Sequence, residues 1–211
     1  IRYDYPSDNI CTPTTNDELF QVMSGGILPS NATQWNWTDI RNVNFMIARS
    51  GNVSGEETAH FVGLARMVRA YLYYYDKVLR YSNVPWYSRD LQTTDEDLLY
   101  KTQDSRSLVV DSVMADLNFA VVNMKSNTDR TLFSKEVALA LLARIALSEA
   151  SWRKYHAELE LNDADKYYQI AIAACEELMR SGSFSLNIDY AANFRNNDLK
   201  GNPEMIMYQD F

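Results

Sequence analysis

The sequence predicts a mainly all-α protein made of antiparallel helix pairs, and three observations support this fold class. Glycine and proline are scarce, with 7 and 5 residues among 211, which is about half of their average usage and disfavours turn-rich β-sandwiches and propellers. Apolar residues recur every three or four positions over several long stretches, which is the spacing of one helix face. Alanines gather in the later stretches, where they allow neighbouring helices to pack closely.

The chain begins with a loop-rich lead-in over residues 1–35. A short helix is expected around residues 17–23, because a glycine pair that breaks helices follows it. A helical scaffold is then expected over residues 36–194. Its first helix is expected to have Thr38 or Asp39 as N-cap, since either side chain can accept a hydrogen bond from the first turn.

The longest helix is expected to begin at a capping box, in which Ser54 is the N-cap and Glu57 its partner three residues later. It is expected to run to about Tyr81 and to end before Pro85, because proline cannot continue a helix. One of its faces should be buried. The members of that face recur at helical spacing and are Phe61, Leu64, Ala65, Val68, Leu72 and Tyr75.

Three further long helices are expected over residues 105–124, 134–155 and 164–180. The middle one is apolar on nearly all sides, which is typical of a helix buried between others. The last one ends before Gly182, which suits the left-handed position after a helix. Because each pair buries its face on the next, we expect degenerate tetratricopeptide-like repeats. A short helix near residues 190–194 and the start of a strand-like segment over 195–211 complete the chain.

The composition excludes several classes of protein. Apolar residues make up 46% of the chain, which is enough to form a core. The formal charge of −8 disfavours nucleic acid as a ligand, because phosphate binding needs a basic face. Two cysteines and two histidines exclude a four-cysteine zinc site and a histidine-rich metal site, so no metal or cofactor is expected. Whether Cys11 and Cys175 pair stays open. No transmembrane helix is predicted, since the apolar runs are too short.

Four stretches stand in a fixed order from about Trp37 onward. They are Trp37-Thr38-Asp39-Ile40 followed by Asn44, residues 65–73 (ARMVRAYLY) leading into Asn83-Val84-Pro85, Arg130 and Lys135 before the alanine-rich helix, and residues 168–194 closing with 203–207. Taken together, this ordered set resembles the SusD/RagB family of nutrient-binding lipoproteins from the outer surface of Bacteroidetes. The resemblance is carried by the order and spacing of the set and not by one motif alone.

The resemblance implies a SusD-like α-α superhelix that binds a glycan or another nutrient and presents it to a SusC-like TonB-dependent transporter. It implies no catalysis. It also implies a lipid anchor at the extracellular face of the outer membrane, outside this sequence, so the chain is expected to be the front portion of a longer protein. Two alternatives stay open: a helical-repeat adaptor that binds a protein partner without binding sugar, and an α-helical enzyme that degrades glycans.

Aromatic residues beside amides are the candidate ligand-binding residues. Sugar rings stack their C–H faces on aromatic rings, while neighbouring polar groups bind the hydroxyls. Trp35, Asn36 and Trp37 combine both features at a helix start, and Trp86 with Tyr87 follows a proline. The alternative for each ring is packing against the core. Packing is the preferred interpretation for Trp37 and for the Trp86-Tyr87 pair.

Charged residues give no sign of a catalytic centre. The acidic run at residues 95–97 is interpreted as a solvated loop or a weak Ca²⁺ site, because no buried acid is paired with a positioned base. We therefore predict no catalytic residues. Arg69 and Arg144 lie in otherwise apolar helices, where a buried guanidinium needs a carboxylate or carbonyl partner.

Overall fold

A computed structural model describes residues 35–195 and 198–209 of the chain. The helical unit spans Trp37–Phe211. The helix expected around residues 17–23 lies outside the described residues. Within the described ranges the fold is all-α, as predicted, and no strand occurs there beyond one isolated backbone bridge.

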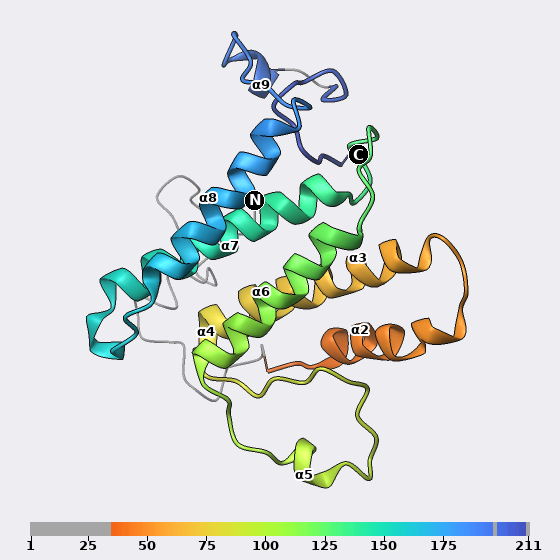
Figure 1. Cartoon of the computed structure of the whole chain (residues 1–211), viewed down its shortest axis with the longest axis vertical. Coiled ribbons are helices and arrows are strands. Elements are labelled where there is room, and N and C mark those ends of the chain that lie inside the picture. Colours follow the sequence, from red (N-terminus) through yellow and green to blue (C-terminus); the bar gives the residue numbers. More distant parts are fainter. Residues whose placement is uncertain (1–34, 196–197, 210–211) are drawn as a thin grey trace, which may run out of the picture. The chain divides into compact units, whose positions relative to one another are not determined.

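The long helices of the described part follow one another with short connections, except for one long loop between α4 and α6 (Figure 1). Their bounds are α2 (Thr38–Arg49), α3 (Thr58–Tyr71), α6 (Arg106–Asn123), α7 (Lys135–Tyr155) and α8 (Ala164–Arg180). The α3 helix continues without a break through the π-helical segment η3 into α4. The shorter elements are η2 (Ser50–Asn52), η3 (Leu72–Val78), α4 (Leu79–Tyr81), α5 (Glu96–Leu99), η4 (Ala157–Leu159) and α9 (Ala192–Arg195).

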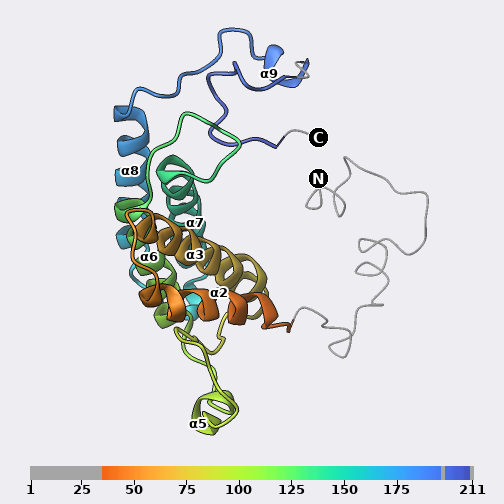
Figure 2. The same ribbon diagram turned by 90° about the vertical axis from the view of Figure 1, so that its right-hand side faces the viewer.

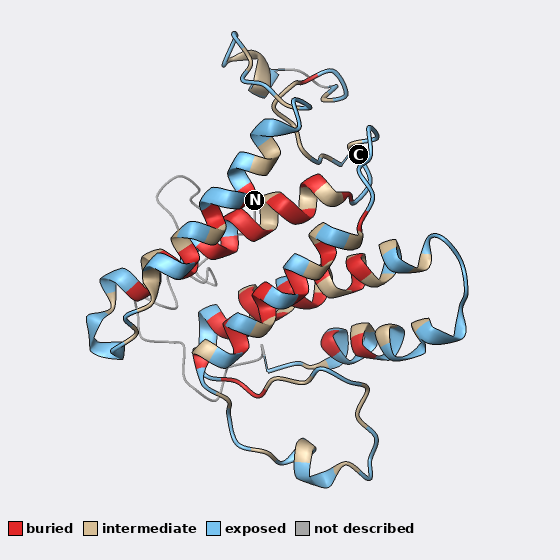
Figure 3. Ribbon diagram, viewed as in Figure 1, coloured by how far each residue is buried: buried red, intermediate tan, exposed pale blue. Residues whose placement is uncertain are grey.

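Each long helix packs on the next, so that α2 contacts α3, α3 contacts α6, α6 contacts α7 and α7 contacts α8. Figure 3 shows buried residues running along α3, α6 and α7. Alanines line this core at several positions, as the sequence predicted. The alanines of the core cluster are Ala70, Ala120, Ala138, Ala143, Ala146, Ala150, Ala171 and Ala174.

Gly63 permits a close approach between α3 and α6. A Cβ atom placed at Gly63 would lie 2.8 Å from Cγ of Met124 and 3.5 Å from Cα of Ala120. The first distance is shorter than a van der Waals contact, so a side chain at this position has no room. Close packing of α3 on α6 therefore depends on the absence of a side chain at Gly63.

Replacing Gly63 by valine is expected to destabilise the protein by about 1–3 kcal/mol, the usual range for overpacking. The added methyl groups would displace Met124 and push α3 away from α6. Urea-induced unfolding measures the change in the free energy of unfolding. Gly51→Val is the matched control, because a Cβ at Gly51 meets no heavy atom within 4 Å. Equal losses in both variants would contradict the packing explanation.

The start of α3 differs from the prediction. The helix begins at Thr58, and no side chain caps its N-terminus. The Glu57 carboxylate pairs with Lys125 after α6, so it does not reach back to Ser54 as a capping box requires. At α2 the prediction is also wrong in detail, because the N-cap position is occupied by Trp37 and no side chain caps the helix.

The buried face of the longest helix agrees with the expected one only in part, since Ala65 is buried and Leu64 packs against the core. Phe61 is 49% exposed, and Leu72 and Tyr75 are only partly buried. Tyr73 and Tyr74 are instead wholly buried. Both lie in η3, where the wider π-helical turn breaks the 3.6-residue period on which the prediction was based.

The C-terminal part agrees with the prediction up to the last residues. Gly182 follows α8 with a φ of +67°, the left-handed conformation expected there. The prediction of a strand-like segment is wrong for the described residues 198–209, which form turns and irregular backbone. A strand is stable only beside a partner strand, and the Tyr208 N–H donates instead to the Arg130 carbonyl at 3.0 Å.

Candidate functional site

Four aromatic rings form the candidate site, where the start of α2, the segment η3 and the loop after α4 meet. Trp37 precedes α2, Tyr73 belongs to η3, and Trp86 and Tyr87 lie in the loop. The Trp37 ring lies edge-on to the rings of Tyr73 and Tyr87, with centroid distances of 6.0 and 5.3 Å. The rings of Tyr73 and Trp86 are 4.2 Å apart. We call these four residues the aromatic cluster.

The members of the aromatic cluster differ in exposure. Tyr73 is wholly buried, whereas Trp37, Trp86 and Tyr87 are partly buried. Trp37 and Trp86 pack against the hydrophobic core, which is the arrangement preferred for them from the sequence. The structure thus brings three of the sequence-predicted site residues together. Contact between their exposed edges and a ligand stays a prediction.

The other two candidates, Trp35 and Asn36, precede the helical unit. Trp35 is 45% exposed, and Asn36 is exposed as well. An exposed indole beside an amide has the chemistry expected of a sugar contact. A ligand-binding role for these two residues also stays a prediction.

The loop that carries Trp86 and Tyr87 is closed at its base. Val84 and Asp104 form an antiparallel backbone bridge. The Asp104 carboxylate accepts hydrogen bonds from the Trp86 N–H at 2.7 Å and from the Lys101 ammonium at 2.5 Å. Lys101 also donates to the Trp86 carbonyl at 2.9 Å. We call this set of contacts the loop neck, because it joins the two ends of the loop.

Charge at the loop neck has consequences for the protonation of nearby groups. Burial acts to raise the pKa of Asp104, but hydrogen bonds from Lys101 and from the Trp86 N–H outweigh it, and the pKa is lowered. Burial raises the pKa of the Tyr87 phenol, and the Asp104 charge adds to the effect. Tyr87 is therefore neutral at physiological pH and retains a hydroxyl proton that it can donate.

A buried hydrogen-bond network supports the loop from the side of the helices. Arg69 holds Asp116 with two parallel bonds, Nε to Oδ2 at 2.7 Å and Nη2 to Oδ1 at 2.8 Å. Arg69 Nη1 also donates to Asn44 Oδ1 at 2.7 Å and to the Ser88 carbonyl at 3.0 Å. Asn44 Nδ2 in turn donates to the Tyr87 carbonyl at 2.9 Å. The three side chains of this Arg69 network link α2, α3 and α6 to the loop.

The sequence foresaw only part of this network. The expected partner of Arg69 is confirmed, whereas Arg144 is exposed and the expectation of burial was wrong for it. Asn44 was not singled out as a site residue. The sequence did contain a sign of its role, because Asn44 lies on the same face of α2 as the apolar Ile40. Both residues are buried. A buried amide on such a stripe needs hydrogen-bond partners.

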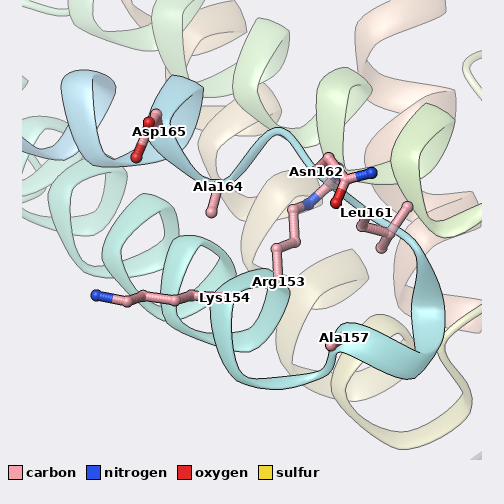
Figure 4. Close-up of a pocket in the computed structure, with 7 residues that line it drawn as sticks. All are labelled: Arg153, Lys154, Ala157, Leu161, Asn162, Ala164 and Asp165. Atoms are coloured by element: carbon pink, nitrogen blue, oxygen red, sulfur yellow. The ribbon is translucent and has the colours of Figure 1, made fainter.

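A separate cavity of about 200 Å³ lies at the connection between α7 and α8 (Figure 4). The buried Arg153 at its wall is already paired with Glu149 at 2.9 Å and with Asp163 at 2.5 Å. No aromatic ring lines this cavity, which makes it a poor match for a sugar. Its lining residues are Arg153, Lys154, Ala157, Leu161, Asn162, Ala164 and Asp165.

Neither a metal-binding cluster nor a membrane-spanning helix occurs in the described ranges. No cluster of three or more histidine, cysteine or acidic side chains is arranged there to hold a metal ion. None of the helices in those ranges combines the length and apolar character that a membrane span requires.

Comparison with solved structures identifies the fold. No family model and no curated protein matches the sequence. A laminarin-binding SusD-like protein is similar with a TM-score of 0.69 and 20% identity, over 92% of this chain and 41% of that one. A protein solved with a xylogluco-oligosaccharide gives a TM-score of 0.72 and 17% identity, over 97% and 41%. A SusD-like carbohydrate-binding protein from Bacteroides fragilis gives 0.61 and 19%, over 83% and 33%.

These likenesses show that the chain has the SusD-like fold, as the resemblance in sequence predicted. At the same time, the chain spans less than half the length of each of these three structures. Laminarin binding and the xylogluco-oligosaccharide belong to those two proteins.

Proposed function

We propose that this chain belongs to a surface protein that captures oligosaccharide and passes it to a SusC-like TonB-dependent transporter. The observation that carries the proposal is the aromatic cluster on a SusD-like scaffold, two of whose structural relatives are a laminarin-binding protein and a protein solved with a xylogluco-oligosaccharide. The proposal places the protein at the extracellular face of the outer membrane, held by a lipid anchor.

Tyr87 is the member of the aromatic cluster best suited to meet a sugar. Its ring is partly exposed, and it does not belong to the set of side chains packed against the core. Its phenol is neutral at physiological pH, as an ordinary tyrosine is, and burial raises its pKa further, so the ring can stack while the hydroxyl forms a hydrogen bond. Binding of this kind needs no general acid or base, and we propose capture without turnover.

Titration calorimetry of the complete protein against laminarin and xyloglucan oligosaccharides tests the proposal. We expect the unchanged protein to bind at least one of them. Tyr87→Ala should weaken binding by about tenfold, which equals about 1.4 kcal/mol, because buried aromatic contacts carry much of a binding energy. Tyr100→Ala is the matched control, since this tyrosine is 84% exposed on the same loop and should leave affinity unchanged.

Two outcomes would contradict the proposed function. One is the absence of binding to every glycan tested, and a protein partner recovered without any sugar affinity would then favour the adaptor alternative. The other is release of reducing sugar from a bound oligosaccharide, which would favour the enzyme alternative. Purification of the tagged protein from outer membranes tests the proposed association with a transporter. We expect the SusC-like transporter to be recovered with the tagged protein.

A further inference from the structure

We propose that the hydroxyl of Tyr73, together with the Arg69 network, is a positioning element that fixes the backbone beneath the Tyr87 ring for ligand binding. This inference rests on the proposed function, because it concerns the same aromatic cluster. None of these buried groups is expected to touch the ligand. They act through the loop that carries Trp86 and Tyr87.

The backbone of this loop has little regular structure of its own. The described residues between α4 and α5 include no strand or long helix, and Val84 forms the only bridge of the segment. Its conformation at Tyr87 must therefore be set by other contacts. Side chains from the helices provide them, because the Tyr87 N–H, the Tyr87 carbonyl and the Ser88 carbonyl are all bound by helix side chains.

Tyr73 supplies the contact to the Tyr87 amide. Its hydroxyl oxygen accepts from the Tyr87 N–H at 2.7 Å. The same oxygen lies 3.4 Å from the Pro85 carbonyl oxygen and 3.5 Å from the Tyr87 carbonyl oxygen, and it donates its proton toward them. One hydroxyl thus serves as acceptor and donor to the same short stretch of backbone. Because Tyr73 is wholly buried, water does not replace this contact easily.

Asn44 binds the Tyr87 carbonyl and Arg69 binds the Ser88 carbonyl, and the geometry of Arg69 determines how Asn44 is oriented. The two parallel bonds to Asp116 fix the plane of the Arg69 guanidinium, so its remaining nitrogen points to Asn44 and Ser88. A guanidinium only donates, and the Asn44 amide must therefore present its oxygen to Arg69. That choice leaves the amide NH₂ facing the Tyr87 carbonyl.

The neighbouring tyrosine offers an internal comparison. Tyr74 also lies in η3 and is also wholly buried. Its hydroxyl, however, donates to Ser148 Oγ on α7 at 3.0 Å and not to the loop. Removing the Tyr74 hydroxyl deletes a bond to another helix, whereas removing the Tyr73 hydroxyl deletes its bond to the Tyr87 N–H and its contacts with the Pro85 and Tyr87 carbonyls. The two phenylalanine variants therefore separate a positioning role from a general loss of stability.

The experiment compares Tyr73→Phe with Tyr74→Phe in the complete protein by hydrogen exchange and by titration with laminarin and xyloglucan oligosaccharides. Both variants are expected to lower the melting temperature, Tyr73→Phe by at least as much as Tyr74→Phe. Only Tyr73→Phe is expected to raise the exchange rate of the Tyr87 amide, by tenfold or more, and only this variant should weaken glycan affinity, by roughly three- to tenfold.

The result that would overturn the inference is equal exchange at Tyr87 in the two variants. Faster exchange in Tyr73→Phe with unchanged affinity would overturn it too, because the hydroxyl would then hold the loop without preparing the site. A failure of the unchanged protein to bind any glycan has a different meaning. It would refute the proposed function, while the exchange rates, which need no ligand, still decide whether Tyr73 fixes the Tyr87 backbone.

Discussion

Glu149→Gln is expected to destabilise the protein by about 3–5 kcal/mol, the usual cost of removing one partner of a buried ion pair. Glu149 is wholly buried on α7 and accepts from two guanidinium groups. Arg106 Nη2 lies 2.7 Å and Arg153 Nε 2.9 Å from its oxygens. A neutral amide of the same size would remove the counter-charge of the buried Arg106 and leave Arg153 with Asp163 alone, and its NH₂ group would face the donors of both guanidinium groups.

Chemical denaturation followed by circular dichroism measures this loss. Glu176→Gln is the matched control, because Glu176 makes an exposed pair with Arg180 at 4.0 Å on α8, and such pairs contribute less than about 1 kcal/mol. If the two glutamine variants unfolded at the same denaturant concentration, the buried charge cluster would not be a main source of stability. Both variants carry the same amino-acid change, at a buried carboxylate with two close guanidinium partners and at an exposed carboxylate with one distant partner.

Arg69→Met is expected to cost about as much, roughly 3–5 kcal/mol, because it leaves Asp116 buried without its cation. Arg69 and Asp116 are 4% and 3% exposed. The effect should extend beyond stability, since Asn44 and the Ser88 carbonyl lose their donor at the same time. Thermal unfolding measures the first effect, and amide exchange in the loop measures the second.

Arg66→Met on the same helix is the control. Arg66 lies near the same carboxylate, with Nη1 3.9 Å from Asp116 Oδ1, but its side chain is 32% exposed. We expect a loss below about 1 kcal/mol and no change in the loop. Similar losses for the two arginines would mean that the net charge near Asp116, and not the paired geometry, decides stability.

The helical scaffold could be predicted from sequence because its signals are local. The α8 helix has the predicted bounds, since its apolar period and the glycine after it lie within a few residues of its ends. Ser105 caps α6 by accepting from the Leu108 N–H, and that helix also lies where it was expected. Elements of this kind are specified by neighbouring residues, whatever the rest of the chain does.

Features that depend on distant residues were missed. The π-helical segment cannot be read from a period of 3.6, and within it Tyr73 and Tyr74 are buried more deeply than Tyr75, which that period places on the buried face. The capping-box pattern at Ser54 failed because Glu57 pairs with Lys125, which follows α6. The capping-box error shows that a tertiary contact can outweigh a local preference worth about 1 kcal/mol.

The sequence predicted individual residues of the candidate site, but it did not predict that these residues lie together. Trp37 and the pair formed by Trp86 and Tyr87 were both identified from their chemistry, yet no pattern indicated that these rings meet. Tyr73 joins them through η3, and Asn44 joins the loop to the helices. Such a juxtaposition depends on how the helices cross, which a single sequence does not encode in any local spacing.

The loop neck separates two parts of the chain that can change independently during evolution. Figure 2 shows α5 at the far end of the loop, away from the long helices, and none of the residues of α5 is buried. Once Val84 and Asp104 are joined, extra residues at the tip add little closure entropy. Mutations and insertions there can accumulate without disturbing Trp86 and Tyr87. The tip is therefore also a practical place to attach a fluorophore or an epitope.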